Sequence, residues 1–429
     1  MQPIDENVLF KKVSWRILPI LMLAFFLSYL DRANVGFAKL QMSADLNFSD
    51  AVYGFGAGIF FIGYFLLEIP SNLILHRVGA RTWISRIMFT WGFLSCAVVL
   101  VRTPYEFYAV RFLLGLAEAG FIPGAIYYMS QWYPEHRRGR AWGTFYIALA
   151  ASGVGGGLLS SFFLGTMSGV AGLAGWQWMM LGEGLPTVLL SIYMFLRMDD
   201  DIAGASWLTD PEKRYLQNML SAQDSAKESE GVMAALTSGK IWVMVGIYFG
   251  FTMGLYAISF WMPTLIQRMG VADPVRIGLL SALPGVCAIL SLIAFGYSAD
   301  KHNERKWHLI TCYVMAAVGF VLCALWQYNP VLGIVALCIA NIGVFSMPAL
   351  FWSVPTSMLT GITAAAGIAL INCIGNLAGF VSPYMIGYLS TVTGRTDIAL
   401  LVVAGVTAFG AVLVYLLMRS SRPGPLAAA

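Results

Sequence analysis

Charged side chains inside otherwise apolar stretches are the residues of this sequence that could do chemistry. Asp31 and Arg32 are neighbours in an apolar run over 17–38, and Arg111 and Glu118 share a second run. A run of about 20 apolar residues can span a bilayer, where each charge costs on the order of 2.5–3.5 kcal/mol. Spanning does not require these charges. They therefore mark a site or pathway, or else neutralise partners on other helices and only hold a bundle together.

Arg111 and Glu118 are seven residues apart, which is about two helical turns and places them on one face, about 10 Å apart along the axis. A planar guanidinium suits a carboxylate ligand because it can form two parallel hydrogen bonds with it. Burial favours the neutral form of a carboxyl group, so Glu118 could take up and release a proton. Together with Asp31 and Arg32, this combination of a permanent cation and an acid that can bind a proton suits proton-coupled uptake of an anion.

The composition indicates the elements that must position these residues. Of 429 residues, 59% are hydrophobic and 11% are charged, whereas soluble domains carry roughly 25% charged residues. This excludes a soluble protein and predicts an all-α membrane protein with 12 transmembrane helices in two six-helix halves. The predicted spans are 17–38, 51–75, 83–101, 105–130, 141–165, 176–197, 241–266, 277–298, 308–327, 330–355, 361–390 and 397–418.

The predicted domains are an N-terminal half (1–197), a polar cytoplasmic linker (198–240) and a C-terminal half (241–429). With the N-terminus inside, 19 of the 26 Lys and Arg residues fall on the cytoplasmic side and five fall outside. Because cytoplasmic loops are rich in Lys and Arg, we predict a multi-pass protein of the cell inner (plasma) membrane with both termini in the cytoplasm.

Two short basic connections, 76–81 and 296–301, occupy corresponding places in the two halves. This weak symmetry is typical of duplicated transporters, whose halves rock about a site near the bilayer midplane. Charged residues in or near these connections are candidates for a gate or for a structural role. They are Glu68, Arg77, Arg81 and Asp300.

The C-terminal half carries no clear intramembrane charge, but it has uncharged polar and aromatic residues such as Tyr256 and Trp352. Asn372 and Asn376 are four residues apart and share a helix face. They could read polar groups of a substrate, or could merely form hydrogen bonds between helices. Glu183, near the start of the sixth span, is interpreted as structural.

The sequence gives little support for a metal site, a disulfide framework, an enzyme or a nucleotide site. The six cysteines are isolated in apolar segments, and the four histidines lie in or beside charged loops, so the sequence predicts no metal site, no disulfide framework and no enzyme. The glycine run at 153–157 follows no strand, so it indicates helix packing rather than a nucleotide site. No cofactor is expected beyond the proton as coupling ion.

The residues discussed above also form motifs, and between 18 and 418 the sequence resembles the anion:cation symporters of the major facilitator superfamily. The Glu-Ile-Pro-Ser-Asn motif at 68–72 looks most like the permeases for tartrate, phthalate, nicotinate and 4-hydroxyphenylacetate. The other motifs are Asp31-Arg32-Ala33-Asn34-Val35-Gly36, Gly63-Tyr64, Val78-Gly79-Ala80-Arg81, the segment 111–123, Trp132-Tyr133-Pro134, Gly175-Trp176-Gln177-Trp178 and the segment 371–383.

The resemblance implies that Asp31 and Glu118 couple transport to protons and that Arg32 and Arg111 serve substrate binding or coupling. It also implies the major facilitator fold and a substrate site lined by Tyr29, Tyr64, Trp352 and Asn372. We add Asn34, Asn376 and Tyr256 as substrate-binding candidates. There are two departures from the family pattern. His76 replaces a usual Asp, and the segment 147–151 is apolar where sugar-acid members carry a Gln, which favours a less hydroxylated, aromatic acid.

The sequence thus predicts a transporter that imports a small organic anion, a mono- or dicarboxylate, by proton symport with alternating access. The alternatives are an antiporter or exporter and a uniporter of organic anions. Export is disfavoured because drug antiporters of this superfamily carry a Gly-Pro motif in the fifth span, and no proline occurs between Pro134 and Pro186. A membrane enzyme or a receptor is less favoured still. The expected partners are the anion, the proton and the lipid bilayer, without nucleic acid, and a monomer suffices.

Overall fold

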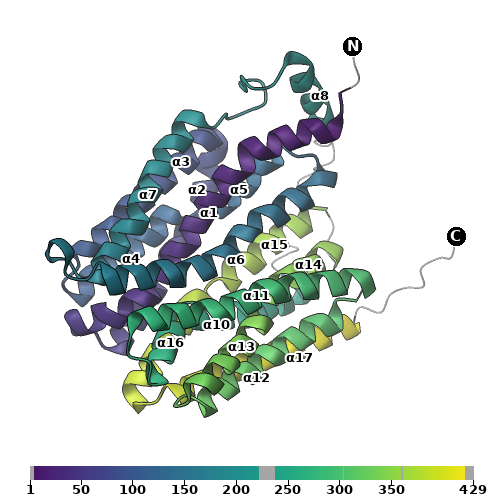
Figure 1. Ribbon diagram of the computed structural model, residues 1–429. Coiled ribbons are helices and arrows are strands. Elements are labelled where there is room, and N and C mark those ends of the chain that lie inside the picture. Colours follow the sequence, from purple (N-terminus) through teal and green to yellow (C-terminus); the bar gives the residue numbers. More distant parts are fainter. Residues whose placement is uncertain (1–3, 222–236, 303, 359–360, 421–429) are drawn as a thin grey trace. The chain divides into compact units, whose positions relative to one another are not determined.

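The computed structural model describes residues 4–221, 237–302, 304–358 and 361–420, and every regular element in these ranges is a helix. Twelve helical segments within them are long and apolar enough to cross a membrane, which confirms the predicted all-α membrane architecture. The first part of the chain (Figure 1) contains α1 (Glu6–Asp45), α2 (Asp50–Val78), α3 (Ala80–Ala97), α4 (Pro104–Glu118), α5 (Phe121–Ser130), α6 (Glu135–Thr166), α7 (Gly175–Arg197) and α8 (Asp210–Ser221). The second part contains α10 (Gly239–Arg268), α11 (Pro274–His302), α12 (Lys306–Leu325), α13 (Pro330–Phe351), α14 (Ser353–Met358), α15 (Gly361–Gly375), α16 (Ala378–Thr393) and α17 (Thr396–Ser420).

Helix α1 begins before the first predicted span, which starts at residue 17, because α1 starts at Glu6. The carboxylate of Asp5 accepts a hydrogen bond from the Asn7 amide at 2.9 Å, which satisfies a free N–H of the first turn. Leu9, Phe10 and Val13 recur at helical spacing and are all buried. Apolar packing therefore extends the helix beyond the predicted span.

Contacts divide the chain into two compact units, which are described separately. Unit 1 comprises Met1–Ala38 and Ile59–Lys227, and unit 2 comprises Lys39–Gly58 and Glu228–Ala429. The division after residue 227 falls inside the predicted linker, of which residues 222–236 lie outside the described ranges. The sequence did not predict that the end of α1 and the start of α2 group with unit 2. The boundaries of the two six-helix halves stay predictions.

Corresponding helices pack in the same way in the two parts of the chain. The third span, α3, packs against the sixth, α7, and the ninth span, α12, packs against the twelfth, α17. Glycine permits the first of these contacts, because a Cβ on Gly92 would lie 3.0 Å from the Gly184 carbonyl and one on Gly184 would lie 2.8 Å from the Gly92 carbonyl. This repeated pairing agrees with a duplicated architecture.

Three predicted spans are interrupted in the structure. The fourth breaks between α4 and α5, where Gly120 has φ +90°, and the tenth breaks at Trp352 between α13 and α14. The eleventh breaks between α15 and α16, next to Asn376. Broken helices are a feature of transporters, in which irregular backbone occurs where it is enclosed by protein or lines a cavity. The interruptions fall beside residues that the sequence selected as site candidates.

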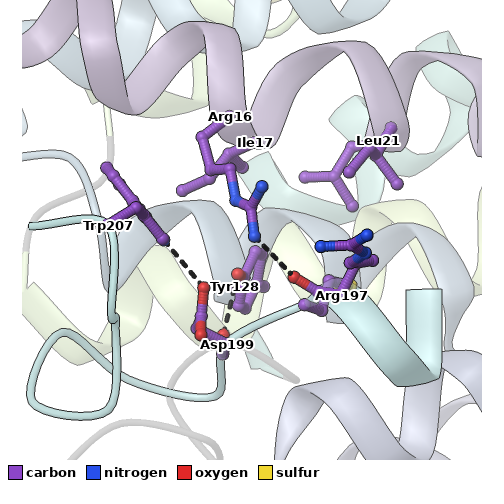
Figure 2. A pocket seen from close by; sticks show the side chains of 9 residues that line it. Arg16, Ile17, Leu21, Tyr128, Arg197, Asp199 and Trp207 are labelled. Atoms are coloured by element: carbon purple, nitrogen blue, oxygen red, sulfur yellow. Dashed lines mark hydrogen bonds between the residues drawn. The ribbon is translucent and has the colours of Figure 1, made fainter. Parts of the chain in front are cut away.

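The segment that follows α7 ties together one end of unit 1 (Figure 2). The Tyr128 hydroxyl donates to the Asp199 carbonyl and the Trp207 indole donates to the Asp199 carboxylate, both at 2.8 Å. Arg16 on α1 donates to the Arg197 carbonyl at 3.3 Å. These bonds hold the ends of α1, α5 and α7 together.

Helix α8 is attached to the start of α1 through Glu212, whose carboxylate accepts hydrogen bonds from Lys12 Nζ and from the Thr209 amide, each at 2.8 Å. Burial alone would raise the pKa of Glu212, but the hydrogen bonds from Lys12 and Thr209 outweigh it, and the pKa is lowered. The charged form of Glu212 is therefore favoured in the folded protein.

Candidate functional site

The centre of the candidate site in unit 1 is a buried ion pair between Arg32 on α1 and Glu118 on α4. Arg32 Nη2 and Nε lie 2.7 Å and 2.9 Å from Glu118 Oε1, and the Ser28 hydroxyl donates to the same oxygen at 2.7 Å. The side chains of Arg32 and Glu118 are 7% and 0% exposed. Two residues that the sequence selected separately are thus direct partners, which their positions 86 residues apart did not reveal.

Glu118 is the last residue of α4, and the interruption that follows it depends on glycine. Gly120 has φ +90°, and a Cβ there would lie 2.3 Å from the Ser71 hydroxyl of α2. Helix C-termini carry a partial negative charge that disfavours a carboxylate. The Arg32 guanidinium compensates for this placement.

Aromatic rings surround the Arg32 guanidinium. Its carbon lies 5.1 Å from the ring centroids of Tyr29 and Tyr64 and 5.4 Å from that of Phe60. The buried guanidinium of Arg111 lies 5.0 Å from the same Phe60 ring. Cation–π contacts of this kind stabilise a desolvated cation without neutralising it. Phe60, which sequence reasoning did not select because it is one apolar residue among many, contacts both predicted anion-binding arginines.

Asp31 has different partners from Arg32, because successive side chains on a helix point about 100° apart. The Asp31 carboxylate accepts a short hydrogen bond from the Ser95 hydroxyl of α3 and a weak one from Asn34 at 3.5 Å. The Asn34 amide also donates to Glu183 on α7 at 2.7 Å. Asp31, Asn34 and Glu183 therefore form a second buried polar cluster in unit 1.

Sequence reasoning treated Glu183 as a structural, partly interfacial residue, yet it is only 2% exposed and lies beside two candidate site residues. The close approach of α3 and α7 at Gly92 and Gly184 brings it there. A signal was present in the sequence, because an acid flanked by Gly182 and Gly184 inside an apolar span sits where a helix can approach closely. The partner of Glu183 could not be read from that signal.

Most of the candidates in unit 2 gather around Tyr248. The Asn372 side-chain oxygen accepts hydrogen bonds from Asn376 at 3.1 Å and from the Tyr248 hydroxyl at 3.4 Å. The Trp352 ring lies 5.0 Å from the Tyr248 ring. Tyr256 lies two turns further along α10, where its ring stacks on another aromatic ring. The sequence did not select Tyr248, although it precedes Tyr256 by eight residues on a similar face.

The gate candidates have varied surroundings. The Arg81 side chain pairs with Asp200 at 3.5 Å, and the Arg81 amide donates to the same carboxylate at 2.8 Å. Glu68 is buried on α2 and Arg77 is exposed near the end of that helix. The side chain of Asp300 lies outside the described residues. The roles of these four residues in a gate stay predictions.

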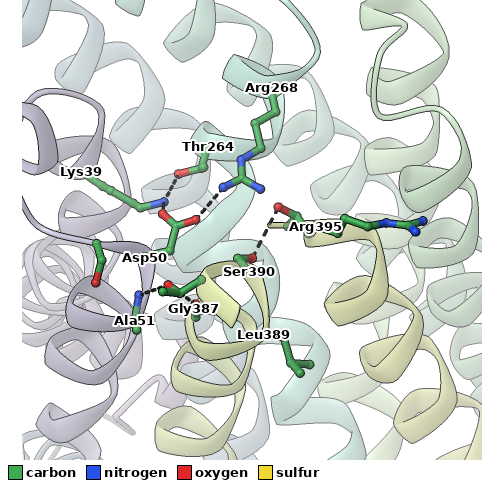
Figure 3. Close-up of polar contacts among 12 residues, drawn as sticks. Lys39, Asp50, Ala51, Thr264, Arg268, Gly387, Leu389, Ser390 and Arg395 are labelled. Carbon is green, nitrogen blue, oxygen red and sulfur yellow. Dashed lines mark hydrogen bonds and ion pairs between the residues drawn. The ribbon is translucent and has the colours of Figure 1, made fainter. Parts of the chain in front are cut away.

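A further charged cluster, which the sequence did not predict, lies in unit 2 where α1 ends and α2 begins (Figure 3). The Asp50 carboxylate lies 2.7 Å from Lys39 Nζ and 2.5 Å from Arg268 Nη2. Lys39 is only 5% exposed, donates to Thr264 at 3.3 Å and lies 4.1 Å from the Trp261 ring centroid. The cluster joins the ends of three different helices.

The same region contains a close approach of two backbones. A Cβ on Gly387 of α16 would lie 2.2 Å from the Asp50 carbonyl, and one on Gly54 of α2 would lie 2.3 Å from the Pro383 carbonyl. Glycine at both positions therefore allows α2 and α16 to touch. We call Lys39, Asp50 and Arg268 the Asp50 cluster.

Cysteine and histidine do not assemble a metal site in the part of the chain that the structure describes. The six cysteines are free thiols, buried or half-buried. The polar clusters described above consist of carboxylates, guanidinium groups, an ammonium group, amides and hydroxyls. These groups can bind and release an anion or a proton.

Twelve helical segments among the described residues are long and apolar enough to cross a membrane, and several of them carry buried charged clusters. The comparisons with known proteins show a family of transporters rather than enzymes. Residues 21–383 and 272–429 match the model of the Major Facilitator Superfamily. The chain belongs to that superfamily and is a multi-pass membrane protein.

Several transporters of known name are similar over nearly the whole chain. The "Putative metabolite transport protein NicT" of Pseudomonas putida is 43% identical over 401 residues, which cover 93% of this chain and 92% of that protein. A "Putative tartrate transporter" of Agrobacterium vitis is 41% identical over 418 residues, with coverage of 97% and 92%. A "Quinolone resistance transporter" of Acinetobacter baumannii is 40% identical over 415 residues, with coverage of 96% and 95%.

Among solved structures, the fold is similar to a bacterial homolog of the human lysosomal transporter Spinster in an inward-facing and unoccupied conformation. The TM-score is 0.76 and the coverage is 96% of this chain and 99% of that one. The sequence identity is 16%, so this likeness shows the fold alone. It confirms the predicted major facilitator fold.

Proposed function

We propose that this transporter imports a small organic anion, a mono- or dicarboxylate, together with protons. The observation that carries the proposal is the buried ion pair of Arg32 and Glu118, in which two guanidinium nitrogens lie 2.7 Å and 2.9 Å from a single carboxylate oxygen. A buried pair is a weak source of stability, because desolvation offsets most of the attraction. Its presence among aromatic rings is better explained by a function in which Arg32 and Glu118 separate.

The pair provides a mechanism for coupling. A substrate carboxylate competes with Glu118 for the Arg32 guanidinium, because both are planar anions that suit the same fork of N–H donors. Protonation of Glu118 removes its charge and releases Arg32 to the substrate. By linkage, a proton that favours anion binding is itself bound more tightly when the anion is present. The anion and the proton would therefore move together.

The surroundings of Arg32 favour a substrate with an apolar or aromatic body. The rings of Tyr29, Phe60 and Tyr64 lie around the guanidinium, and Arg111 supplies a second buried cation in contact with the Phe60 ring. Two cations suit a dicarboxylate, and one cation with ring faces suits an aromatic monocarboxylate. Tyr256, Trp352, Asn372 and Asn376 stay predicted substrate contacts from unit 2, and Asn34 stays one from unit 1.

Orientation and location follow from the distribution of positive charge. Nineteen of 26 Lys and Arg residues lie in segments that are cytoplasmic if the N-terminus is inside. We therefore place both termini in the cytoplasm and the protein in the inner (plasma) membrane. A monomer with two halves contains all the parts that the proposal requires.

Uptake into proteoliposomes with an imposed inward proton gradient tests the proposal. The panel of acids is phthalate, 4-hydroxyphenylacetate, nicotinate, tartrate and galactonate. Accumulation of at least one acid, abolished by a protonophore, supports symport. Glu118→Gln should lose gradient-driven accumulation while keeping exchange of labelled for unlabelled substrate. If wild-type vesicles accumulate none of the acids, the import proposal fails.

A second candidate function is export or antiport of an organic anion. The similarity to a quinolone resistance transporter favours it, whereas the lack of proline between Pro134 and Pro186 argues against it. Preloaded vesicles distinguish the two. Efflux driven by an opposing proton gradient, without uptake of the acids above, would support antiport, and proton-independent counterflow alone would support a uniporter.

A further inference from the structure

Two buried carboxylates in unit 1 share one amide. Asn34 Nδ2 donates to Glu183 Oε2 at 2.7 Å and to Asp31 Oδ1 at 3.5 Å. Asn34 and Glu183 are each 2% exposed and Asp31 is 3% exposed. Asp31 and Asn34 come from α1 and Glu183 from α7, and the Ser95 hydroxyl of α3 donates a hydrogen bond to Asp31. This cluster lies on a different side of α1 from the ion pair of Arg32.

Each carboxylate in the cluster keeps one oxygen without a hydrogen-bond partner among the described residues, namely Asp31 Oδ2 and Glu183 Oε1. Buried acids that serve only to hold helices together normally have their acceptors satisfied. A protonated carboxyl group presents an O–H at such an oxygen and carries no charge, so an unpartnered oxygen is better tolerated in that form. The cluster is therefore built to hold a proton.

The charges around the cluster do not neutralise two carboxylates. Glu118 and Arg111, both on α4, act on Asp31 with opposite sign, and Glu118 is itself paired with Arg32, so the single charge of Arg111 balances at most one of the two carboxylates. On α3 the Cys96 thiol lies in the field of Asp31, and on α7 Glu183 experiences the field of Asp31. The Arg32 guanidinium is engaged with Glu118. Two like charges linked by a neutral amide favour a state with one shared proton.

We propose that Asp31 and Glu183, bridged by Asn34, form a proton-binding pair in which one proton is shared, and that Glu183 is a coupling residue of this transporter. The proposal rests on the proposed proton symport and deepens it. A proton from the aqueous phase binds one carboxylate oxygen and the pair keeps a single negative charge. Its release returns the pair to two charges, and no other group changes its bonding.

This assignment separates two tasks on α1. Arg32 and Glu118 exchange the anion, whereas Asp31 and Glu183 hold a proton on another side of the same helix. A purely structural Glu183 would instead tolerate replacement by glutamine without any change in proton binding, because the amide can still accept from Asn34. The two interpretations therefore differ in a measurable way.

Infrared difference spectroscopy of the purified protein between acidic and alkaline pH tests the pair without any transport measurement. The carboxyl band of wild-type protein should contain a buried titrating acid. In Glu183→Gln, and reciprocally in Asp31→Asn, the titration of the remaining acid should move to lower pH by about one unit or more, because its like-charged neighbour is gone. Glu212→Gln, at a solvated acid on α8, is the matched control and should leave the band unchanged.

Identical titration of the buried acid in wild-type protein and in both single variants would overturn the proposal. If Glu183→Gln does not yield folded protein, Asp31→Asn and the conservative Glu183→Asp answer the same question, since Glu183→Asp should keep a coupled titration. In vesicles, Glu183→Gln should lose accumulation at least tenfold while keeping exchange. If wild-type vesicles accumulate no acid, the proposed function fails, but the infrared result still decides whether the pair shares a proton.

Discussion

Replacing Asp50 by asparagine tests how the ends of α1 and α2 are held within unit 2. Asp50 is the acidic member of the Asp50 cluster, and its carboxylate contacts Lys39 at 2.7 Å and Arg268 at 2.5 Å. Asp50→Asn keeps the size and one hydrogen-bonding oxygen but removes the charge. It leaves Lys39, which is 5% exposed, as a buried cation without its carboxylate.

The expected magnitude follows from the burial of the three side chains. Breaking a fully buried pair by removing one partner destabilises a protein by about 3–5 kcal/mol, because the remaining charge is uncompensated. Here Asp50 is 21% exposed and Arg268 is 36% exposed, so water screens part of the interaction. We therefore expect a loss of about 2–3 kcal/mol, which lowers the unfolding midpoint of a unit of this size by roughly 5–10 °C.

Thermal unfolding of the purified protein in detergent measures this loss. Asp273→Asn is a matched control, because Asp273 faces Arg276 at 3.7 Å with side chains that are 49% and 79% exposed. Exposed pairs contribute about 0–1 kcal/mol, so the control should shift the midpoint by no more than about 3 °C. Equal shifts for the two variants would refute the reasoning that burial of Lys39 sets the magnitude.

Other predictions concern unit 1. Glu118→Gln replaces a charged acceptor of Arg32 by a neutral one, which is weaker by about 1–2 kcal/mol. Binding of the transported acid, followed by thermal shift, should therefore tighten roughly 5- to 30-fold at alkaline pH and lose the part of its pH dependence that comes from Glu118. An affinity equal to that of wild-type protein at both acidic and alkaline pH would contradict this. Gly120→Ala should destabilise the protein by about 1–3 kcal/mol, because φ is +90° and the added Cβ meets Ser71 at 2.3 Å; an unchanged unfolding midpoint would count against this. The pKa of Glu212 is lowered on folding, so its stabilising contribution is complete above the ordinary glutamate pKa of about 4.3 and is lost as the pH falls through the folded-state pKa. The difference in unfolding midpoint between wild-type and Glu212→Gln should therefore be constant above about pH 5 and shrink below it, and a difference that grows on acidification would contradict the sign.

The sequence by itself determined the membrane architecture and four of the charged candidates. Apolar length decides whether a helix can span a bilayer, so all 12 predicted spans correspond to helical segments of the structure. A charge inside such a span stands out because it is costly. For this reason Asp31, Arg32, Arg111 and Glu118 could be selected without any knowledge of their partners.

Only the tertiary structure decided which groups meet. Arg32 pairs with Glu118 on α4, whereas the adjacent Asp31 accepts a hydrogen bond from Ser95 on α3, because successive residues of a helix point in different directions. The position of Glu183 depends on the close approach of α3 and α7 at Gly92 and Gly184. Lys39 pairs with the carboxylate of Asp50, which lies at the start of the next helix. Spacing along the chain fixes positions on one helix, but helix rotation and packing between helices determine the contacts of each side chain.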